Sequence, residues 1–137
     1  MRNKRVNKEI NKLIAEYFFL EKGCHISYPY MKVCIEDDIF ISRKALKHIV
    51  EARKDDDYGI ARIQDMFLKI PETIHEPDLV IPNWNKKYQR SIISGKLYLE
   101  IREALLVIQD TNGEIIDVIN AFFRRRDKFE KLRATFQ

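Results

Sequence analysis

Four side chains of this sequence have the chemistry to move a proton or to hold an anion: His48, Arg53, Arg90 and Asn120. Histidine changes its charge near neutral pH more readily than any other side chain, so His48 suits proton transfer. The guanidinium groups of Arg53 and Arg90 stay protonated and can fork onto phosphate oxygens. The Asn120 amide can orient an anion or donate a hydrogen bond to it. Together these residue types suit a proton transfer beside a firmly held phosphate.

Transesterification of RNA is one reaction that could use this set without a metal ion. It needs a base for the 2′-hydroxyl proton, an acid for the leaving 5′-oxygen and cations around the phosphorane. His48 would carry the proton transfer, because Arg53 remains protonated and cannot act as a base. A plainer interpretation is equally open, in which His48 is half-exposed and Arg53 snorkels from an amphipathic helix.

Other residues would contact a nucleic acid outside such a centre. Trp84 and Tyr88 would stack on bases. Each group also has a structural interpretation, because Trp84 fits a partly buried anchor and the arginines fit a solvated surface after a strand. The residues expected to follow the phosphate backbone are Lys86, Lys87, Arg124, Arg125 and Arg126.

Length and composition indicate one globular domain over residues 1–137. The chain has 45% hydrophobic and 34% charged residues, which favours a packed core with a charged surface. Its net charge of +4 permits a polyanionic partner without requiring one. No apolar run approaches the roughly 20 residues that cross a bilayer, and no secretory signal is evident. We therefore expect a cytoplasmic protein without a membrane association.

The possible metal ligands are few. Cys24, His25 and Cys34 lack the close ligand pairs of a zinc site, and the two cysteines are expected to be reduced thiols rather than a disulfide. The run 55–57 holds three carboxylates, which fit the cap of the following helix better than a metal site. The sequence also has no Gly-rich phosphate loop. We expect neither a metal nor another cofactor.

In the first half of the chain, apolar spacing predicts helices over 3–22 and 58–70, the second ended by Pro71. Short strands are expected within 25–35. The stretch from Ile39 to Lys54 reads as a strand end, an N-cap at Ser42 and a short helix that carries His48.

In the second half, the pattern predicts a strand over Leu79–Ile81, two hairpins and a closing helix. The Ser94-Gly95 pair would join 87–93 with 96–101, and Asn112-Gly113 would join 104–111 with 114–123. Arg90 would then be a lone charge on an apolar face, and Asn120 would lie opposite Leu105. Residues 97–110 also fit one helical face, and strands are favoured over that helix.

Three stretches carry a resemblance to a known family: ISRKALKHIVEAR, EPDLVIPN and IIDVINAFF. With the order of elements around them, they resemble the phage-associated members of the barnase, EndoU, colicin and RelE-like nuclease superfamily. The resemblance covers residues 35–125. It implies an α+β fold with N-terminal helices packed on a small antiparallel sheet, and metal-independent cleavage of RNA. Residues 1–34 would add a helix and short strands, and residues 126–137 a C-terminal helix or tail.

The sequence departs from that family at two positions. Arg53 stands where a second histidine is common, and Asn120 stands where the final strand often has Thr or Ser. Two alternatives to a ribonuclease therefore stay open: a noncatalytic nucleic-acid- or protein-binding module on the same fold, and an immunity-type interaction protein. The partners that these hypotheses imply are RNA, with tRNA among the candidates, and an inhibitor or immunity protein.

Overall fold

A computed structural model describes residues 26–27, 30–32, 39–83, 91–112 and 115–136, so the expected helix over 3–22 lies outside the described residues. The described residues form an α+β fold, as expected. Its helices are α2 (Arg43–Asp55), α3 (Ile60–His75) and α4 (Arg126–Thr135). Its strands are β1 (Ile26–Ser27), β2 (Tyr30–Lys32), β3 (Ile39–Ser42), β4 (Leu79–Pro82), β5 (Ser91–Tyr98), β6 (Glu103–Asn112) and β7 (Ile115–Arg125).

The strands form one sheet in the order β1-β2-β3-β7-β6-β5-β4. Every neighbouring pair is antiparallel except β3 and β7, which run parallel. The expectation of an antiparallel sheet is therefore wrong, and the sheet is mixed. The physical reason is the long connection between β3 and β7, because parallel neighbours need a crossover rather than a tight turn.

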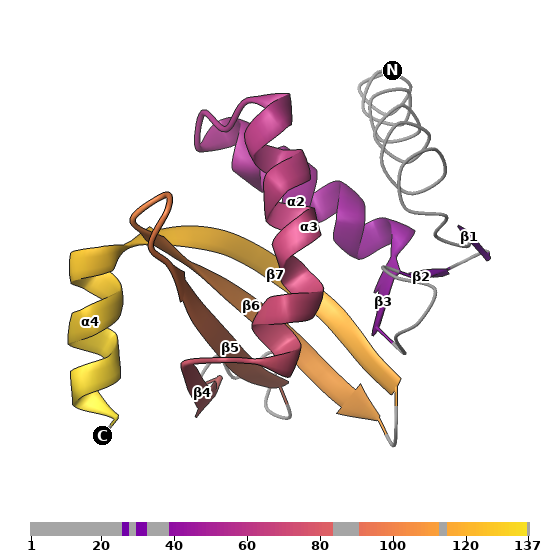
Figure 1. Ribbon diagram of the computed structural model, residues 1–137. Coiled ribbons are helices and arrows are strands. Elements are labelled where there is room, and N and C mark those ends of the chain that lie inside the picture. The colour runs from indigo at the N-terminus through magenta and orange to yellow at the C-terminus, as the bar shows by residue number, and fades with distance from the viewer. Residues whose placement is uncertain (1–25, 28–29, 33–38, 84–90, 113–114, 137) are drawn as a thin grey trace.

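The sheet has an apolar core on each face. Leu105 and Val107 of β6 point to the face that α2 and α3 cover, and Ala104 and Leu106 point to the face that α4 covers. Figure 1 shows α2 and α3 over the sheet and α4 standing apart from them. The sheet is thus held between two helices on one side and one helix on the other.

The stretch from β3 into α2 folds as the sequence predicts. The Ser42 side chain accepts a hydrogen bond from the amide of Ala45 at 3.0 Å, which confirms the N-cap. Leu46, Ile49 and Val50 then bury the inner side of α2. In the described part of the chain, no helix combines the length and apolar character needed to cross a membrane.

Helix α3 continues through Pro71 to His75, so the prediction that Pro71 ends it is wrong. Proline removes one backbone donor but does not prevent a helix from continuing when its last turn is held by other contacts. Thr73 is buried in that turn and its hydroxyl lies 2.9 Å from the Tyr98 hydroxyl of β5. Tyr98 also donates to the Lys69 carbonyl at 3.1 Å. These contacts tie the end of α3 to the sheet.

The predicted turn at Ser94-Gly95 is also wrong, because both residues lie inside β5. Gly95 is there for close packing: a Cβ atom at this position would lie 2.8 Å from Leu106 Cδ2 and from Phe129 Cε1. The chain instead turns between β5 and β6, where Arg102 has a positive φ of 55°.

A hairpin of β6 and β7 is confirmed, but its strands close on the pair Asn112–Ile115, so the prediction that Asn112 belongs to the turn is wrong. Residues 97–110 form strand and turn rather than a helix. Its register differs from the expected one, because Asn120 pairs with Ile108 and Leu105 pairs with Phe123. The closing pair Asn112–Ile115 shifts the register by two residues from the expected one, and a bulge next to Ile108 and Gln109, which inserts one extra residue in β7, shifts the pairs beyond it by one more. The closing helix is confirmed as α4, with Phe129 fully buried.

Candidate functional site

The most developed polar site lies along one edge of β7. Strand β3 pairs with β7 only from Ile116 to Val118, so the backbone beyond Val118 needs other partners on that side. Side chains supply them. Arg53 Nη1 donates to the Ala121 carbonyl at 2.7 Å, and the Phe123 amide donates to the Tyr58 hydroxyl at 3.0 Å.

Arg53 is buried at the centre of this edge, with 8% of its surface exposed. Its Nη2 atom lies 3.1 Å from Asp56 Oδ2 in an ion pair. Its guanidinium carbon lies 5.7 Å and 5.5 Å from the ring centroids of Tyr58 and Phe122. The helical spacing that placed Arg53 in the apolar sector of α2 is therefore confirmed, and the charge is held by a carbonyl, a carboxylate and two rings.

Asn120 reaches the same point from β7. Its Oδ1 atom accepts a hydrogen bond from the Ala121 amide at 2.9 Å, so Arg53 and Asn120 bind the two polar groups of one residue. The structure thus brings these two predicted site residues together at Ala121. We call Arg53, Tyr58, Asn120 and Ala121 the β7-edge site.

His48 is not part of the β7-edge site. It lies on the exposed side of α2, about 140° around the helix from the buried Arg53. Among the described side chains, none forms a hydrogen bond or an ion pair with it. The expected grouping of His48 with Arg53 and Asn120 is therefore not formed, because Leu46, Ile49 and Val50 take the inner side of the helix.

Five predicted site residues fall in the segment 84–90, which lies outside the described residues: Trp84, Lys86, Lys87, Tyr88 and Arg90. This segment joins Asn83 to Ser91, whose side chains form a hydrogen bond of 2.8 Å. The roles expected for these five residues therefore stay predictions.

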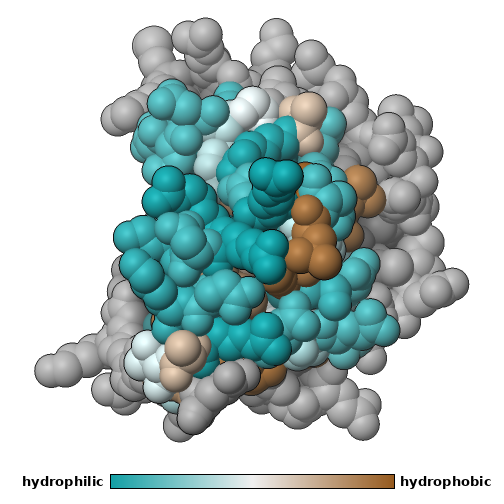
Figure 2. Space-filling view, turned by 60° about the vertical axis from the view of Figure 1, so that its left-hand side comes forward, coloured by the Kyte–Doolittle hydropathy of each residue, from teal (hydrophilic) through white to brown (hydrophobic). Residues whose placement is uncertain are grey.

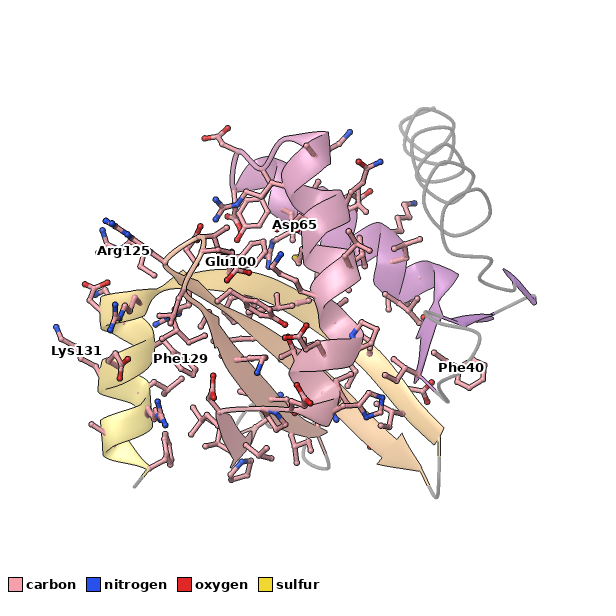
Figure 3. All side chains as sticks on the ribbon, viewed as in Figure 1. Phe40, Asp65, Glu100, Arg125, Phe129 and Lys131 are labelled. Atoms are coloured by element: carbon pink, nitrogen blue, oxygen red, sulfur yellow. The ribbon has the colours of Figure 1, made fainter. Side chains whose placement is uncertain are left out.

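The predicted arginine cluster lies exposed where β7 meets α4. Between residues 124 and 137 the sequence has six basic and two acidic residues, a balance equal to the +4 of the whole chain. Figure 3 shows Arg125 and Lys131 projecting away from the protein while Phe129 points from α4 to the sheet. The side on which α4 lies is largely hydrophilic, with one compact apolar patch (Figure 2). We call the exposed residues Arg124, Arg125, Arg126, Lys128 and Lys131 the basic surface.

Weak ion pairs partly balance the basic surface. Arg125 Nε lies 3.6 Å from Asp127, and Arg126 Nε lies 3.9 Å from Glu130. Exposed pairs of this kind contribute roughly 0–1 kcal/mol, so they leave the arginines available to other anions.

Sequence reasoning missed the contribution of the loop after α2. Asp55–Asp57 were expected to cap the next helix, but α3 has Gly59 as its N-cap and no side-chain capping bond. Asp56 pairs with Arg53 instead. Tyr58 and Arg62 are one helical turn apart in sequence, which was the available signal for their contact.

Arg62 links this loop to the sheet. Its guanidinium carbon lies 4.4 Å from the Tyr58 ring centroid, and Nη2 lies 2.6 Å from Glu103 Oε2. Burial lowers the pKa of Arg62, but its hydrogen bonds and charge interactions with Glu103 and Tyr58 outweigh that effect and raise the pKa above its usual value. Arg62 therefore remains a cation beside the β7-edge site.

The sequence analysis also missed a pair of neighbouring carboxylates in the hairpin of β6 and β7. Asp110 of β6 and Asp117 of β7 are direct cross-strand partners. Burial raises the pKa of Asp117, and the charge of Asp110 raises it further. Within the described ranges, no three His, Cys, Asp or Glu side chains are grouped so that they could hold a metal ion.

Comparison with known proteins adds no relative to this picture. No family model, no curated protein and no solved structure matches this chain.

Proposed function

We propose that this chain is an RNA-binding domain that engages the phosphate backbone with its basic surface. One observation carries the proposal: the segment that forms the end of β7 and α4 holds a formal charge equal to that of the whole chain, and its arginines are exposed. The total charge is mild, so its distribution rather than its size favours a polyanion.

The geometry of the basic surface suits phosphate groups. Arg124 and Arg125 end β7 and Arg126 begins α4, and the alternation of side chains along a strand places Arg124 and Arg125 on opposite faces. Each arginine can bind two phosphate oxygens at once. Release of counterions from the nucleic acid would then supply most of the binding free energy.

Fluorescence anisotropy with labelled tRNA and a labelled single-stranded RNA tests this proposal. Arg125→Glu is the informative variant, and Lys44→Glu, at an exposed position on α2, is its control with the same change in net charge. We expect Arg125→Glu to weaken binding at least tenfold and Lys44→Glu to weaken it less than about twofold. Equal losses in both variants would contradict a local binding surface.

Metal-independent cleavage of RNA is a second candidate function. The contact of Arg53 and Asn120 with the same residue, Ala121, favours it, because a guanidinium and an amide beside each other can hold and orient a phosphate. It ranks second because the exposed His48 does not contact either residue.

The cleavage proposal is tested by incubating the protein with total RNA and tRNA in EDTA and mapping new ends. His48→Ala and Asn120→Ala are the variants, each checked for intact folding by circular dichroism. We expect discrete cleavage that both substitutions abolish. The absence of cleavage at high protein concentration would withdraw the catalytic roles and leave RNA binding as the function.

A further inference from the structure

The guanidinium of Arg53 has one edge that is only half occupied. Nη1 donates to the Ala121 carbonyl, and Nη2 contacts one oxygen of Asp56. Nε is buried and has no hydrogen-bond partner among the described residues.

That free edge has the shape of a bidentate anion site. The N–H groups of Nε and Nη2 point in parallel, so together they bind two oxygens of one carboxylate or phosphate. Asp56 supplies one such contact, and the buried Nε donor stays unsatisfied, which is unfavourable for any buried polar group. A phosphate could supply oxygens to both atoms, whereas Asp56 reaches only one.

Asp56 is a counter-ion that can leave. The Asp56 side chain is 56% exposed, and its pair with Arg53 spans only three residues at the end of α2. Solvent screens such a carboxylate strongly, so its attraction for Arg53 is weak compared with that of a dianion. The two rings and the Ala121 carbonyl would keep the guanidinium in place after Asp56 moves away.

We propose that Arg53 is a phosphate-binding residue and that Asp56 occupies its site in the absence of ligand. Asp56 then sets the phosphate affinity of the site by competing for Nη2. The proposal rests on the proposed function for the source of the ligand, since the phosphate would belong to an RNA held by the basic surface.

The chain offers matched controls for this test. Asp55 and Asp57 flank Asp56, are exposed like it, and form no ion pair among the described residues. Asp55→Asn, Asp56→Asn and Asp57→Asn therefore change the net charge equally, but only Asp56→Asn removes the carboxylate charge that pairs with Arg53. The readout is the Nε–H resonance of Arg53 in ¹⁵N-labelled protein, titrated with inorganic phosphate and separately with a short RNA.

We expect Asp56→Asn to bind inorganic phosphate about fivefold or more tightly than the Asp55→Asn and Asp57→Asn variants, with a shift of the Arg53 Nε–H resonance. Equal affinities in the three variants, or an Arg53 resonance that phosphate does not move, would overturn the proposal.

The titration with RNA separates this proposal from the proposed function. If RNA binds and depends on Arg125 while the Arg53 resonance stays fixed, Arg53 is not a phosphate-binding residue and the RNA-binding function stands. If inorganic phosphate shifts Arg53 in the Asp56→Asn variant but RNA does not bind, the anion site stands and the proposed function fails.

Discussion

Two arginines at β7, Arg53 and Arg125, differ in burial and in the contacts that hold them. Arg53 is 8% exposed and reaches the middle of the strand from α2, whereas the Arg125 side chain at the end of the strand is 72% exposed. The first is fixed by a carbonyl, a carboxylate and two aromatic rings. Among the described residues, the Arg125 side chain forms an ion pair with Asp127 alone, at 3.6 Å. Equal charges are thus available to a ligand to different degrees. Burial makes Arg53 part of the fold and leaves one guanidinium edge for an anion, whereas exposure leaves the Arg125 side chain available to a partner.

Phe129→Ala is expected to have the largest effect, because it removes the residue that fixes the exposed group of arginines. Phe129 is fully buried between α4 and the sheet, where it packs against Gly95. We expect a loss of about 3–5 kcal/mol in the free energy of unfolding, measured by urea denaturation. RNA affinity should fall with the loss of α4.

The control for Phe129→Ala is the amide resonance of Ala45, which donates to Ser42 at the start of α2 and should stay unchanged because α2 packs on the other face of the sheet. A change of less than about 1 kcal/mol in the free energy of unfolding would show that α4 is not held by Phe129.

Alanine at the two arginines tests the comparison itself. Arg53→Ala leaves the Ala121 carbonyl without its donor and removes a side chain packed against Tyr58 and Phe122. We expect it to lower the free energy of unfolding by about 2–3 kcal/mol, and Arg125→Ala to change it by less than about 0.5 kcal/mol. Similar values for both in urea denaturation would remove the distinction between the two groups.

Asp117, near the start of β7, is less buried than Arg53 and less exposed than Arg125. Replacing it should raise the free energy of unfolding slightly rather than lower it. Burial and the charge of Asp110 raise the pKa of its carboxyl in the folded protein. The folded pKa of Asp117 lies above the unfolded one, so the protonated carboxyl favours the folded protein. This contribution to the free energy of unfolding is full at pH values below the usual aspartate range. It is lost as pH rises through the raised pKa. Asp117→Asn should therefore be more stable than the wild type at neutral pH.

The expected gain for Asp117→Asn at pH 7 is under about 1 kcal/mol, as for other like-charge cross-strand pairs. Thermal unfolding at pH 3 and pH 7 measures it, and the gain should shrink at the lower pH. In an Asp110→Asn background the gain should also shrink. An equal gain in both backgrounds would show that Asp110 does not contribute.

Local rules predicted much of the fold. Capping chemistry and apolar spacing predicted the Ser42 cap, the buried face of α2, the hairpin of β6 and β7, and α4. The prediction of a turn at Ser94-Gly95 was wrong because glycine also occurs where two elements approach closely. The element that approaches Gly95 carries Phe129, which is far along the chain. The prediction that Pro71 ends α3 was wrong because the last turn is held by the contact between Thr73 and Tyr98, which are also far apart in the sequence.

The β7-edge site was predicted only in part, because it too depends on contacts between residues far apart in the sequence. Helical spacing identified Arg53 as a buried charge, but its partner carbonyl at Ala121 is 68 residues away and depends on β3 ending its pairing early. The position at which the hairpin closes and the bulge in β7 together changed the partner of Asn120, and no residue type in that strand marks the bulge. His48 lay at the margin of the apolar face, and only the packing of α2 decided that it is exposed.

The salt dependence of RNA binding tests the central claim most directly. The logarithm of the association constant should fall linearly with the logarithm of salt concentration, with a slope set by the number of phosphate contacts. Replacing Arg124, Arg125 and Arg126 together by Gln should make that slope shallower by about 2–3 and should leave the free energy of unfolding nearly unchanged. A slope equal to that of the wild type would contradict RNA binding through the basic surface.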